Sequence, residues 1–410
     1  YGHTGVFILV ATIAALIVAN ALLGGRRSRA ATRLFGIAYR AFGVFGYALL
    51  IVTLVQFGLR GQITGFSGDR SAADFDPSAP DIWLVLLDGY PRADMLVRDW
   101  DYDGPAIEQG LEDLGFHVVE DAHSNYNMTK LALGALFNMA LLEDVEPWSD
   151  HALPTDTPPA QRAVALQRNR AFDLLREHGY HTTSVSGGYT HEDIRAVDEF
   201  VDAGTADVVE FFLLGKSAIG ALLQWLDPGF AERQVAERVE RSLATLERLA
   251  AEPHERPRFV FAHLPAPHPP YSFASVERPT VPLNAVFGYQ AGLFGEDHKK
   301  EAYREHVAGT NELLLASLAD VVEQVGDDAV VIVMSDHGPR PGGYEGLTTD
   351  QAAAQFSILL AARTPDGEPL FEQDAVATDV LSTVANRYLG TDIPPVERIF
   401  EANDGVRYPE

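Results

Sequence analysis

The chain has 410 residues, of which 47% are hydrophobic, and its 31 Lys and Arg stand against 58 Asp and Glu, a formal charge of −27. Residues 1–60 hold six Arg and no acidic residue, so residues 61–410 hold 25 basic and 58 acidic side chains, or −33. A segment this acidic is predicted to bind no nucleic acid, because phosphate neutralisation needs clustered Lys and Arg. The absence of Cys excludes disulfides, thiolate metal sites and Cys nucleophiles.

Two apolar stretches near the start of the chain have the length of transmembrane helices. Residues 6–23 and 41–59 are almost free of polar side chains, and residues 24–40 between them are basic without any acid. Since short Lys- and Arg-rich loops stay in the cytoplasm, everything after the second stretch should lie outside the cytoplasm. A signal peptide is one alternative for the first stretch, but its basic flank follows the apolar run instead of preceding it. Two buried helices of a soluble fold are the other alternative.

These features predict a membrane region over residues 1–60, a linker over 61–80 that is rich in Gly, Ser, Asp and Pro, and an extracytoplasmic domain over 81–410. Within the domain, short apolar runs alternate with amphipathic stretches. In chain order we expect a strand at 82–87, a helix at 107–114, a strand at 116–119, a helix at 169–178, a strand at 181–185, a helix at 231–251, a strand at 258–262, a proline-rich loop at 265–290, a helix at 301–325, strands at 329–334 and 356–361, and a helix at 379–389. This alternation implies an α/β fold whose mostly parallel sheet is covered by helices on both faces.

Unusual polar side chains follow the predicted strands or begin a helix. In chain order they are Asp88, Thr129, His263, His268, Asp336 and His337. Ligands of such sheets bind beyond the carboxyl ends of the strands. Carboxylates together with imidazole favour a divalent cation. A hydroxyl at a helix start beside such a cation, such as that of Thr129, loses its proton more readily and becomes a nucleophile.

Each of these residues also has a simpler interpretation. Asp88 could form an ordinary turn ahead of Gly89, and Thr129 could be a plain helix N-cap. His263 could be a hydrogen-bonded core histidine, and His268 could be a loop residue between prolines. Their order and placement taken together favour a functional site.

The segments LLDGYPR, SNYNMT, HLPAPHPPY and SDHG resemble the sulfatase-like branch of the alkaline phosphatase superfamily. Within it they are most similar to membrane-anchored bacterial relatives of lipoteichoic acid synthase and phosphoethanolamine transferases, over residues 81–390 and the preceding apolar stretches. The resemblance implies an α/β/α sandwich and one divalent metal ion (Mn, Mg, Zn or Ca). It assigns that metal to four residues, Asp88, Thr129, Asp336 and His337. It makes Thr129 the nucleophile and matches His263 and His268 to positions that face substrate or a second metal. We expect these three residues to act in catalysis, with the neighbouring Lys130 as a further catalytic candidate.

Departures from the family pattern narrow the expected chemistry. True sulfatases carry Cys or Ser followed two residues later by Pro and then Arg, whereas Thr129 is followed by Lys130, Leu131 and Ala132, so sulfate ester hydrolysis is disfavoured. Two-zinc phosphodiesterases of the superfamily use a further histidine well after the Asp-His pair, but no histidine follows His337, which favours either a single metal or a second metal site built differently. The resemblance implies a cell-membrane enzyme that moves a phospho-alcohol group onto an envelope glycan or lipid through a phospho-Thr intermediate. A hydrolase of soluble phosphate esters and a catalytically silent envelope scaffold remain the alternatives.

Overall fold

The computed structural model describes residues 75–145, 166–167, 169–204, 207–275, 281–283, 286, 296–340, 343 and 345–409. They all belong to one compact unit, Asp69–Glu410. The predicted membrane helices at 6–23 and 41–59, and the linker up to residue 74, lie outside the described residues. In the described part of the chain, no single helix has the length and apolar composition needed to cross a bilayer.

A seven-stranded sheet forms the centre of the unit, in the order β2-β7-β6-β1-β5-β3-β4. The strands β1, β3, β4, β5 and β6 run parallel, and β7 is antiparallel to both of its neighbours. The strands are β1 (Asp81–Asp88), β2 (His117–Val118), β3 (His181–Val185), β4 (Glu199–Val201), β5 (Arg258–Pro267), β6 (Ala329–Ser335) and β7 (Leu360–Arg363). A separate pair, β8 (Phe400–Glu401) and β9 (Arg407–Tyr408), is antiparallel. The sheet is therefore mixed but mostly parallel.

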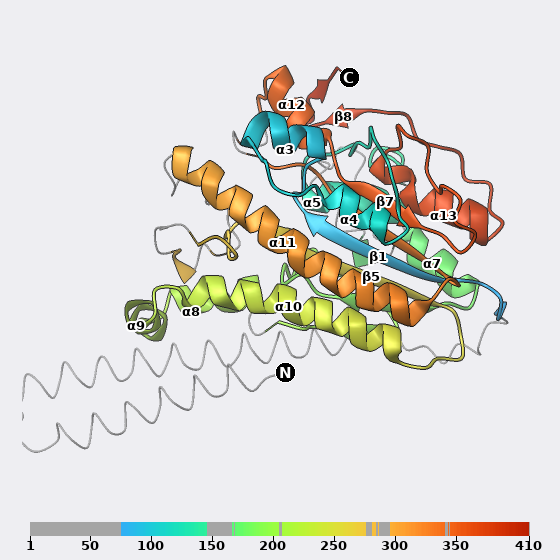
Figure 1. The fold of residues 1–410 in the computed structure, drawn as a ribbon, viewed down its shortest axis with the longest axis horizontal. Coiled ribbons are helices and arrows are strands. Elements are labelled where there is room, and N and C mark those ends of the chain that lie inside the picture. The colour runs from blue at the N-terminus through green and yellow to red at the C-terminus, as the bar shows by residue number, and fades with distance from the viewer. Residues whose placement is uncertain are drawn as a thin grey trace, which may run out of the picture. The chain divides into compact units, whose positions relative to one another are not determined.

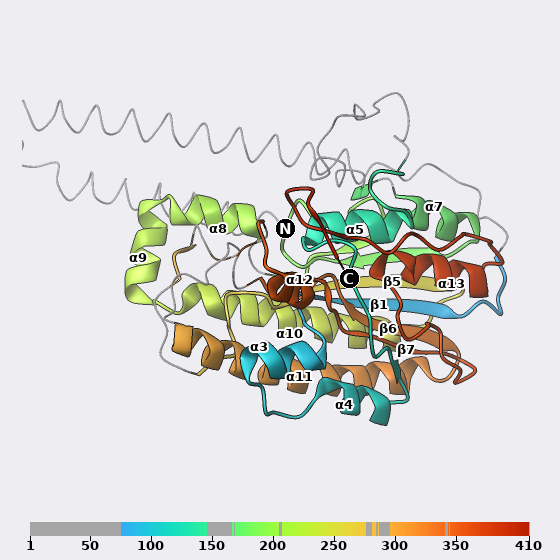
Figure 2. The same ribbon diagram turned by 90° about the horizontal axis from the view of Figure 1, so that it is seen from above.

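Helices cover both faces of this sheet, as Figures 1 and 2 show. Helices α4, α10 and α11 pack on the face that receives Trp83, Val85 and Leu87 of β1. Helices α5, α7 and α13 pack on the face that receives the alternate β1 residues, Leu84 among them. The helices are α3 (Ala93–Trp100), α4 (Ile107–Asp113), α5 (Thr129–Asn138), α7 (Arg170–Glu177), α8 (Val208–Gly215), α9 (Ala218–Leu226), α10 (Phe230–Ala251), α11 (Glu296–Val325), α12 (Thr349–Phe356) and α13 (Val380–Tyr388), with the 3₁₀ turn η5 (Ala377–Asp379) before the last.

The central strand β1 explains why the fold has two cores. It lies between β5 and β6, so that Leu84 is opposite Phe261 on one side and Ile332 on the other. A strand buried on both faces needs a continuous apolar run, and the run that follows Asp81 provides one. Its last residue, Asp88, is buried as well, although its carboxyl group is polar. A buried carboxyl group does not contribute to apolar packing, so its position points to a functional role for the carboxyl edge of the sheet.

Most predicted elements are present, and two differ in informative ways. The run 356–361 is not one strand, because Phe356 closes α12 and β7 begins only at Leu360. Strand β5 continues past residue 262 to Pro267, and a register shift places Pro267 opposite Asp88. The expected loop at 265–290 therefore begins within a strand.

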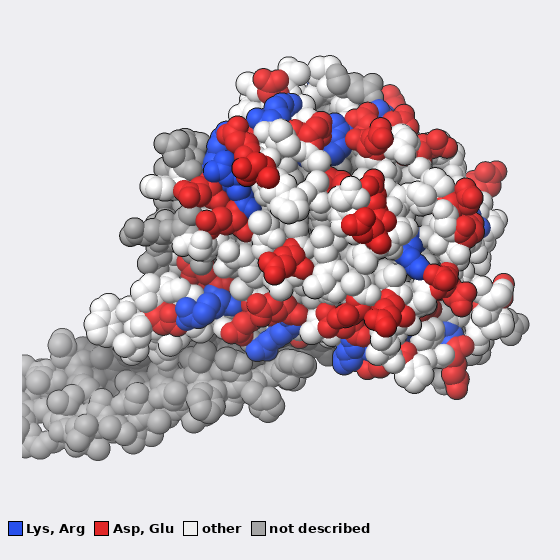
Figure 3. Space-filling view, viewed as in Figure 1, with Lys and Arg blue, Asp and Glu red and all other residues white. Residues whose placement is uncertain are grey.

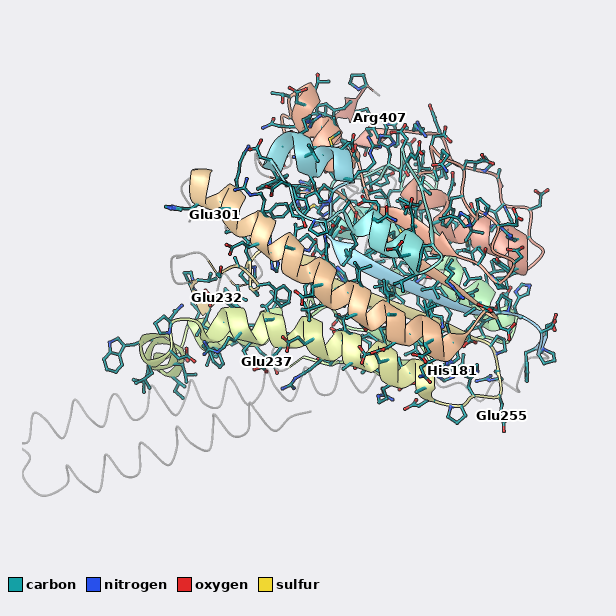
Figure 4. The ribbon with its side chains drawn as sticks, in the orientation of Figure 1. His181, Glu232, Glu237, Glu255, Glu301 and Arg407 are labelled. Carbon is teal, nitrogen blue, oxygen red and sulfur yellow. The ribbon has the colours of Figure 1, made fainter. Side chains whose placement is uncertain are left out.

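Many charged side chains lie on the outside of this arrangement. On the face drawn in Figure 3, acidic side chains are spread widely and Lys and Arg lie among them. In Figure 4, Glu237 of α10 and Glu301 of α11 point away from the sheet, and Glu237 pairs with Arg241 one helical turn later at 3.2 Å. The long helices are thus amphipathic, with their apolar sides on the sheet.

Candidate active site

The two neighbouring strands β1 and β6 place three titratable side chains together at the carboxyl edge of the sheet. Asp88 is the last residue of β1, and Asp336 and His337 directly follow β6. Strand order puts β1 beside β6, and parallel strands end at the same edge. All three side chains are buried. The strand-end positions therefore converge on one point, as the sequence predicted.

The side-chain atoms of this cluster surround a small space. His337 Nε2 lies 3.2 Å from Thr129 Oγ1, 3.3 Å from Asp336 Oδ2 and 3.8 Å from Asp88 Oδ1. One ligand atom from each of Asp88, Asp336 and His337 lies within 4.8 Å of the others. Three oxygens and one nitrogen thus face a common centre.

Hydrogen bonding at the cluster fits a divalent cation. His337 Nδ1 lies 2.7 Å from the Gly338 carbonyl oxygen, which can only accept, so Nδ1 carries the proton and Nε2 presents its lone pair to the cluster. The buried atoms Asp88 Oδ1 and Asp336 Oδ2 have no hydrogen-bond partner among the described residues. Buried acceptors left without donors are costly, and a bound cation would satisfy them all.

Without a cation, the charges around the cluster disfavour the ionised forms of Asp88 and His337. Burial, followed by the charges of Asp336 and Glu192, raises the pKa of Asp88 well above its ordinary value. Burial, followed by the positive charge of Arg340, lowers the pKa of His337 well below its ordinary value. A low imidazole pKa keeps His337 neutral, which is the protonation state of a metal ligand.

Thr129 is held at the cluster by the start of helix α5. It is the first residue of the helix, and Met128 occupies the N-cap position without a side-chain hydrogen bond. The simpler interpretation of Thr129 as an N-cap is therefore wrong. Among the described residues, no partner is found for the backbone N–H groups of Thr129 and Lys130, so the helix start presents free donors beside the Thr129 hydroxyl.

His263 reaches the same site from inside strand β5. Its Nε2 lies 3.8 Å from Asp88 Oδ2 and has no hydrogen-bond partner among the described residues, although the side chain is buried. The facing residue is Gly187, where a Cβ would lie 2.9 Å from His263 Nδ1. Only glycine leaves room for the ring there. His263 is thus placed against the cluster and is not a hydrogen-bonded core histidine at Nε2.

His268 lies next to the site and is held by two contacts. Its Nδ1 lies 2.7 Å from the Pro269 carbonyl oxygen, which can only accept, and 2.9 Å from the Tyr189 hydroxyl oxygen. Burial, followed by the charge of Arg340, lowers the pKa of His268 to about 3. Near neutral pH this side chain is therefore a neutral imidazole.

The loop after β3 supplies residues that the sequence interpretation missed. Glu192 is buried, and one of its oxygens has no hydrogen-bond partner among the described residues, while the other lies 3.3 Å from His191 Nε2. Its negative charge contributes to the raised pKa of Asp88. The hydrogen bond that His191 donates to the Glu192 carboxylate raises the pKa of His191, and the nearby Lys130 opposes that effect. Lys130 thus lies near this loop, and among the described residues its side chain makes no hydrogen bond or ion pair with the four predicted metal ligands.

A small pocket opens beside His337 and His268. Its lining includes three aromatic side chains and two basic ones, namely Trp100, Tyr271, Tyr303, Lys299 and Arg340. The rings of Trp100 and Tyr303 lie 3.9 Å apart between centroids. Arg340 also donates to the Asn127 carbonyl oxygen at 3.2 Å, which ties the turn after His337 to the segment before Thr129. The pocket combines an apolar wall with positive charge next to the cluster.

A mostly parallel α/β sheet with a buried carboxylate–imidazole group at its carboxyl edge defines a class of enzyme fold that can hold a divalent cation. The family model described as Sulfatase matches residues 80–369, well over half of the chain, so this chain belongs to the sulfatase family. The resemblance inferred from the four short motifs is thereby confirmed. The fold is therefore that of the sulfatase family of enzymes.

Several solved structures are similar at low sequence identity. The C-terminal periplasmic domain of EcEptC from Escherichia coli is 14% identical with a TM-score of 0.47, covering 78% of this chain and 87% of that chain. The soluble domain of lipooligosaccharide phosphoethanolamine transferase A from Neisseria meningitidis is 12% identical with a TM-score of 0.46, covering 77% and 89%. Phosphonate monoester hydrolase of Agrobacterium radiobacter is 14% identical with a TM-score of 0.46, covering 75% and 73%. No relative was found among curated proteins.

Proposed function

We propose that this chain is a metal-dependent phosphoester transferase or hydrolase that uses Thr129 as its nucleophile. The observation that carries the proposal is the position of the Thr129 hydroxyl, 3.2 Å from His337 Nε2 within the buried carboxylate cluster. A threonine needed only for helix capping would lie one residue earlier and bond to its own helix. Here the hydroxyl faces the cluster instead.

Asp88, Asp336, His337 and the Thr129 hydroxyl are the residues that would hold the metal. When bound, a divalent cation would lower the pKa of the Thr129 hydroxyl and neutralise charge on the transferring group. One imidazole among oxygen donors favours Mn or Zn over Mg and Ca.

The chain's own residues account for binding and for the covalent step. The free N–H groups at the start of α5 and the Arg340 guanidinium lie where they can hold phosphoryl oxygens. Thr129 Oγ1 loses its proton to water and bonds to phosphorus while the bond from phosphorus to the leaving alcohol breaks. The leaving oxygen takes a proton from His263 or water. The low pKa of His268 removes its imidazolium form as the acid near neutral pH.

In the second step an acceptor hydroxyl gives its proton to water and bonds to phosphorus, while the bond from phosphorus to Thr129 Oγ1 breaks. Thr129 Oγ1 then takes a proton from water, which restores the free side chain. The acceptor is an envelope glycan, a lipid or water. The apolar wall and the basic side chains of the pocket beside His337 suit a phosphoester with an apolar or polyol leaving group. Transfer to an envelope acceptor and hydrolysis of soluble phosphate esters differ only in the acceptor and in where the donor is found. Hydrolysis of soluble phosphate esters is therefore the second candidate.

Membrane attachment is a separate part of the proposal. It rests on the apolar stretches 6–23 and 41–59 and on the basic residues between them. With the domain outside the cytoplasm and tethered by the linker 61–80, lipid-borne donors and envelope polymers are the substrates within reach.

Turnover of bis(p-nitrophenyl) phosphate by the full chain in detergent, with added Mn²⁺ or Zn²⁺, tests the chemistry. Thr129→Ala should lose several orders of magnitude in rate, as removal of a nucleophile does, and Thr129→Ser should recover part of it. The matched control is Thr183→Ala in β3, which removes a buried hydroxyl for which no hydrogen-bond partner is found among the described residues. Near wild-type turnover by Thr129→Ala, or none by the wild type with any metal, contradicts the proposal. The second result favours a silent scaffold, and turnover of p-nitrophenyl sulfate in its place favours a sulfatase.

A further inference from the structure

Most of the large apolar side chains that are exposed in the described part of the chain lie on two short helices. Of the seven large apolar side chains that are exposed there, five belong to α8 and α9: Phe212, Leu213, Leu222, Trp225 and Leu226. Trp225 is 76% exposed and Leu226 is 64% exposed. Exposed apolar side chains on a protein surface are normally single and scattered. A cluster of five on adjoining helices therefore indicates a contact surface. We call the segment Val208–Leu226 the α8–α9 elbow.

Helix caps and a close contact between the two helices define the bend of the elbow. Asp207 caps α8 through a capping box, and Ser217 caps α9 by accepting from the Gly220 N–H at 2.9 Å. A Cβ at Gly220 would lie 1.9 Å from the Leu214 carbonyl oxygen, so the two helices meet closely at a bend of 93°. Each helix is only about 12–13 Å long, far short of the hydrocarbon core of about 30 Å. The elbow therefore suits a shallow position in a bilayer surface and not a straight span.

The composition of the elbow matches a lipid interface. Its only charged residues are Glu210 and Lys216, which leave it without net charge, whereas residues 61–410 carry −33. Anionic lipid repels the rest of this acidic unit but has no net charge to repel at the elbow. Trp and Lys are residue types that lie at bilayer surfaces, with an apolar body and a polar end. Lys216 Nζ lies 5.5 Å from the ring centre of Phe212, at the edge of the apolar surface.

The position of the elbow connects it with the candidate active site. Helix α9 and the carboxyl end of β1 lie toward the same end of the described unit, and the start of β1 lies toward the other (Figures 1 and 2). Packing also connects α8 with the site. Its buried residue Phe211 lies in one hydrophobic cluster with Tyr189, and the Tyr189 hydroxyl contacts His268. A tether that enters at the start of β1 leaves the active-site end free to turn, and a lipid contact at the elbow would hold that end at the bilayer.

We propose that the α8–α9 elbow inserts into the bilayer surface that faces the domain and brings the carboxyl edge of the sheet to lipid-borne substrates. The occupant is lipid, because the surface is apolar, uncharged overall and fitted with Trp225 at its most exposed point. The inference rests on the proposed membrane attachment only in that the linker, at most about 70 Å long when extended, keeps a bilayer near. It does not depend on the chemistry at Thr129.

The absence of Cys makes a direct test possible. Leu222→Cys and Leu226→Cys in the full chain, each labelled with the environment-sensitive dye NBD, would be reconstituted with phosphatidylcholine vesicles with and without phosphatidylglycerol. Val97→Cys in α3 and Val406→Cys near β9 are the matched controls, since both positions are exposed and apolar but lie away from the elbow. Quenching by doxyl-labelled lipid is compared with quenching by aqueous iodide.

At the elbow we expect blue-shifted emission, strong quenching by doxyl lipid and protection from iodide, with the reverse at both controls. Iodide quenching at Leu222→Cys equal to that at Val97→Cys overturns the proposal. Protection from iodide without doxyl quenching also overturns it, because the elbow is then covered by protein. Turnover of bis(p-nitrophenyl) phosphate by the same preparations reports separately on the proposed function.

Discussion

The fold resists protonation of the His268 imidazole, a partly buried group beside the candidate site. Burial, with the charge of Arg340 as the second cause, lowers its pKa from 6.5 to about 3. As pH falls below 6.5, the unfolded chain binds the proton before the folded protein does. The stabilising effect of a neutral His268 is therefore complete above pH 6.5 and is lost progressively as pH falls toward 3.

His268→Gln removes this difference in proton binding. Between pH 7 and pH 5 the free energy of unfolding of the wild type should fall by about 2 kcal/mol more than that of the variant. Urea unfolding at the two pH values measures the difference. The exposed His117 gives the control, since His117→Gln removes an imidazole that is open to solvent. Equal pH dependence in wild type and His268→Gln would place the titrating group elsewhere.

The carboxyl groups of Asp88 and Asp336 repel one another when no cation lies between them. Asp88→Asn removes one of these charges, so the metal-free variant should be more stable than the metal-free wild type, by about 1–3 kcal/mol. Added Mn²⁺ or Zn²⁺ should reverse the order, because only the wild type gains about 2.7 kcal/mol at a metal concentration of 100 times Kd.

Thermal unfolding with a chelator and then with metal tests this pair of expectations. The exposed Asp103 provides a matched control, and Asp103→Asn should respond to metal as the wild type does. An equal gain from metal in wild type and Asp88→Asn would remove Asp88 from the metal site.

The residues that the sequence could locate are those that follow strands directly. Asp88 and Asp336 are found because an apolar run ends and a carboxylate follows, and parallel strands bring such ends together. Glu192 lies further along the loop after β3, so only the folded loop shows that its charge acts on Asp88. Applying the strand-end rule to the strand at 181–185 would have drawn attention to that loop. Arg340 had no comparable signal, since a basic residue in a turn is ordinary.

At the level of elements, the turn that carries His337 depends on how β6 is followed by α12. The Gly338 N–H donates to the Gln355 carbonyl oxygen at 2.8 Å, and a Cβ on Gly338 would lie 1.9 Å from the Ala354 carbonyl oxygen. The turn after His337 thus passes against the end of the helix with no space for a side chain. Because the Gly338 carbonyl also orients the His337 ring, the packing of two elements controls the orientation of a predicted metal ligand.

Gly338→Ala should therefore weaken metal binding by roughly 10–100-fold, the usual effect of disturbing a group that orients a ligand, although no predicted ligand is changed. Isothermal titration with Mn²⁺ or Zn²⁺ measures the affinity. Gly367→Ala is the control, because its Cβ would meet open space while its positive φ makes Ala strained. That variant should lose stability and keep its affinity. Unchanged affinity in Gly338→Ala would show that the turn does not orient His337.

The prediction of strands and helices succeeded where a segment had one clear pattern, either a continuous apolar run or a helical repeat. The runs that became β1 and β6 are apolar throughout, and the amphipathic run that became α10 repeats with a helical period. It failed at 356–361, where an apolar run continues from the last turn of α12 into β7 and no local residue marks the change. The reversed direction of β7 also has no local signal, because strand direction is decided by the return path of the chain.

At the scale of the whole molecule, the proposed arrangement places the acidic unit outside the cytoplasm. Protease added to intact spheroplasts should then digest the domain, because only the basic residues between the apolar stretches stay inside. Immunoblotting against a C-terminal tag measures the loss, with a cytoplasmic marker as the control for lysis. Full protection of the tag in intact spheroplasts and digestion only after permeabilisation would reverse the topology.

The measurement that tests the account most directly is detection of the covalent intermediate. Full-length protein loaded with Mn²⁺ or Zn²⁺ would be mixed briefly with bis(p-nitrophenyl) phosphate, quenched in acid, digested and analysed by mass spectrometry. We predict a p-nitrophenyl phosphate adduct on Thr129 that appears before steady state, shifts to the serine side chain in Thr129→Ser and is absent in Thr129→Ala. An adduct on another residue, or rapid turnover by Thr129→Ala without any adduct, would contradict the central claim that Thr129 is the nucleophile.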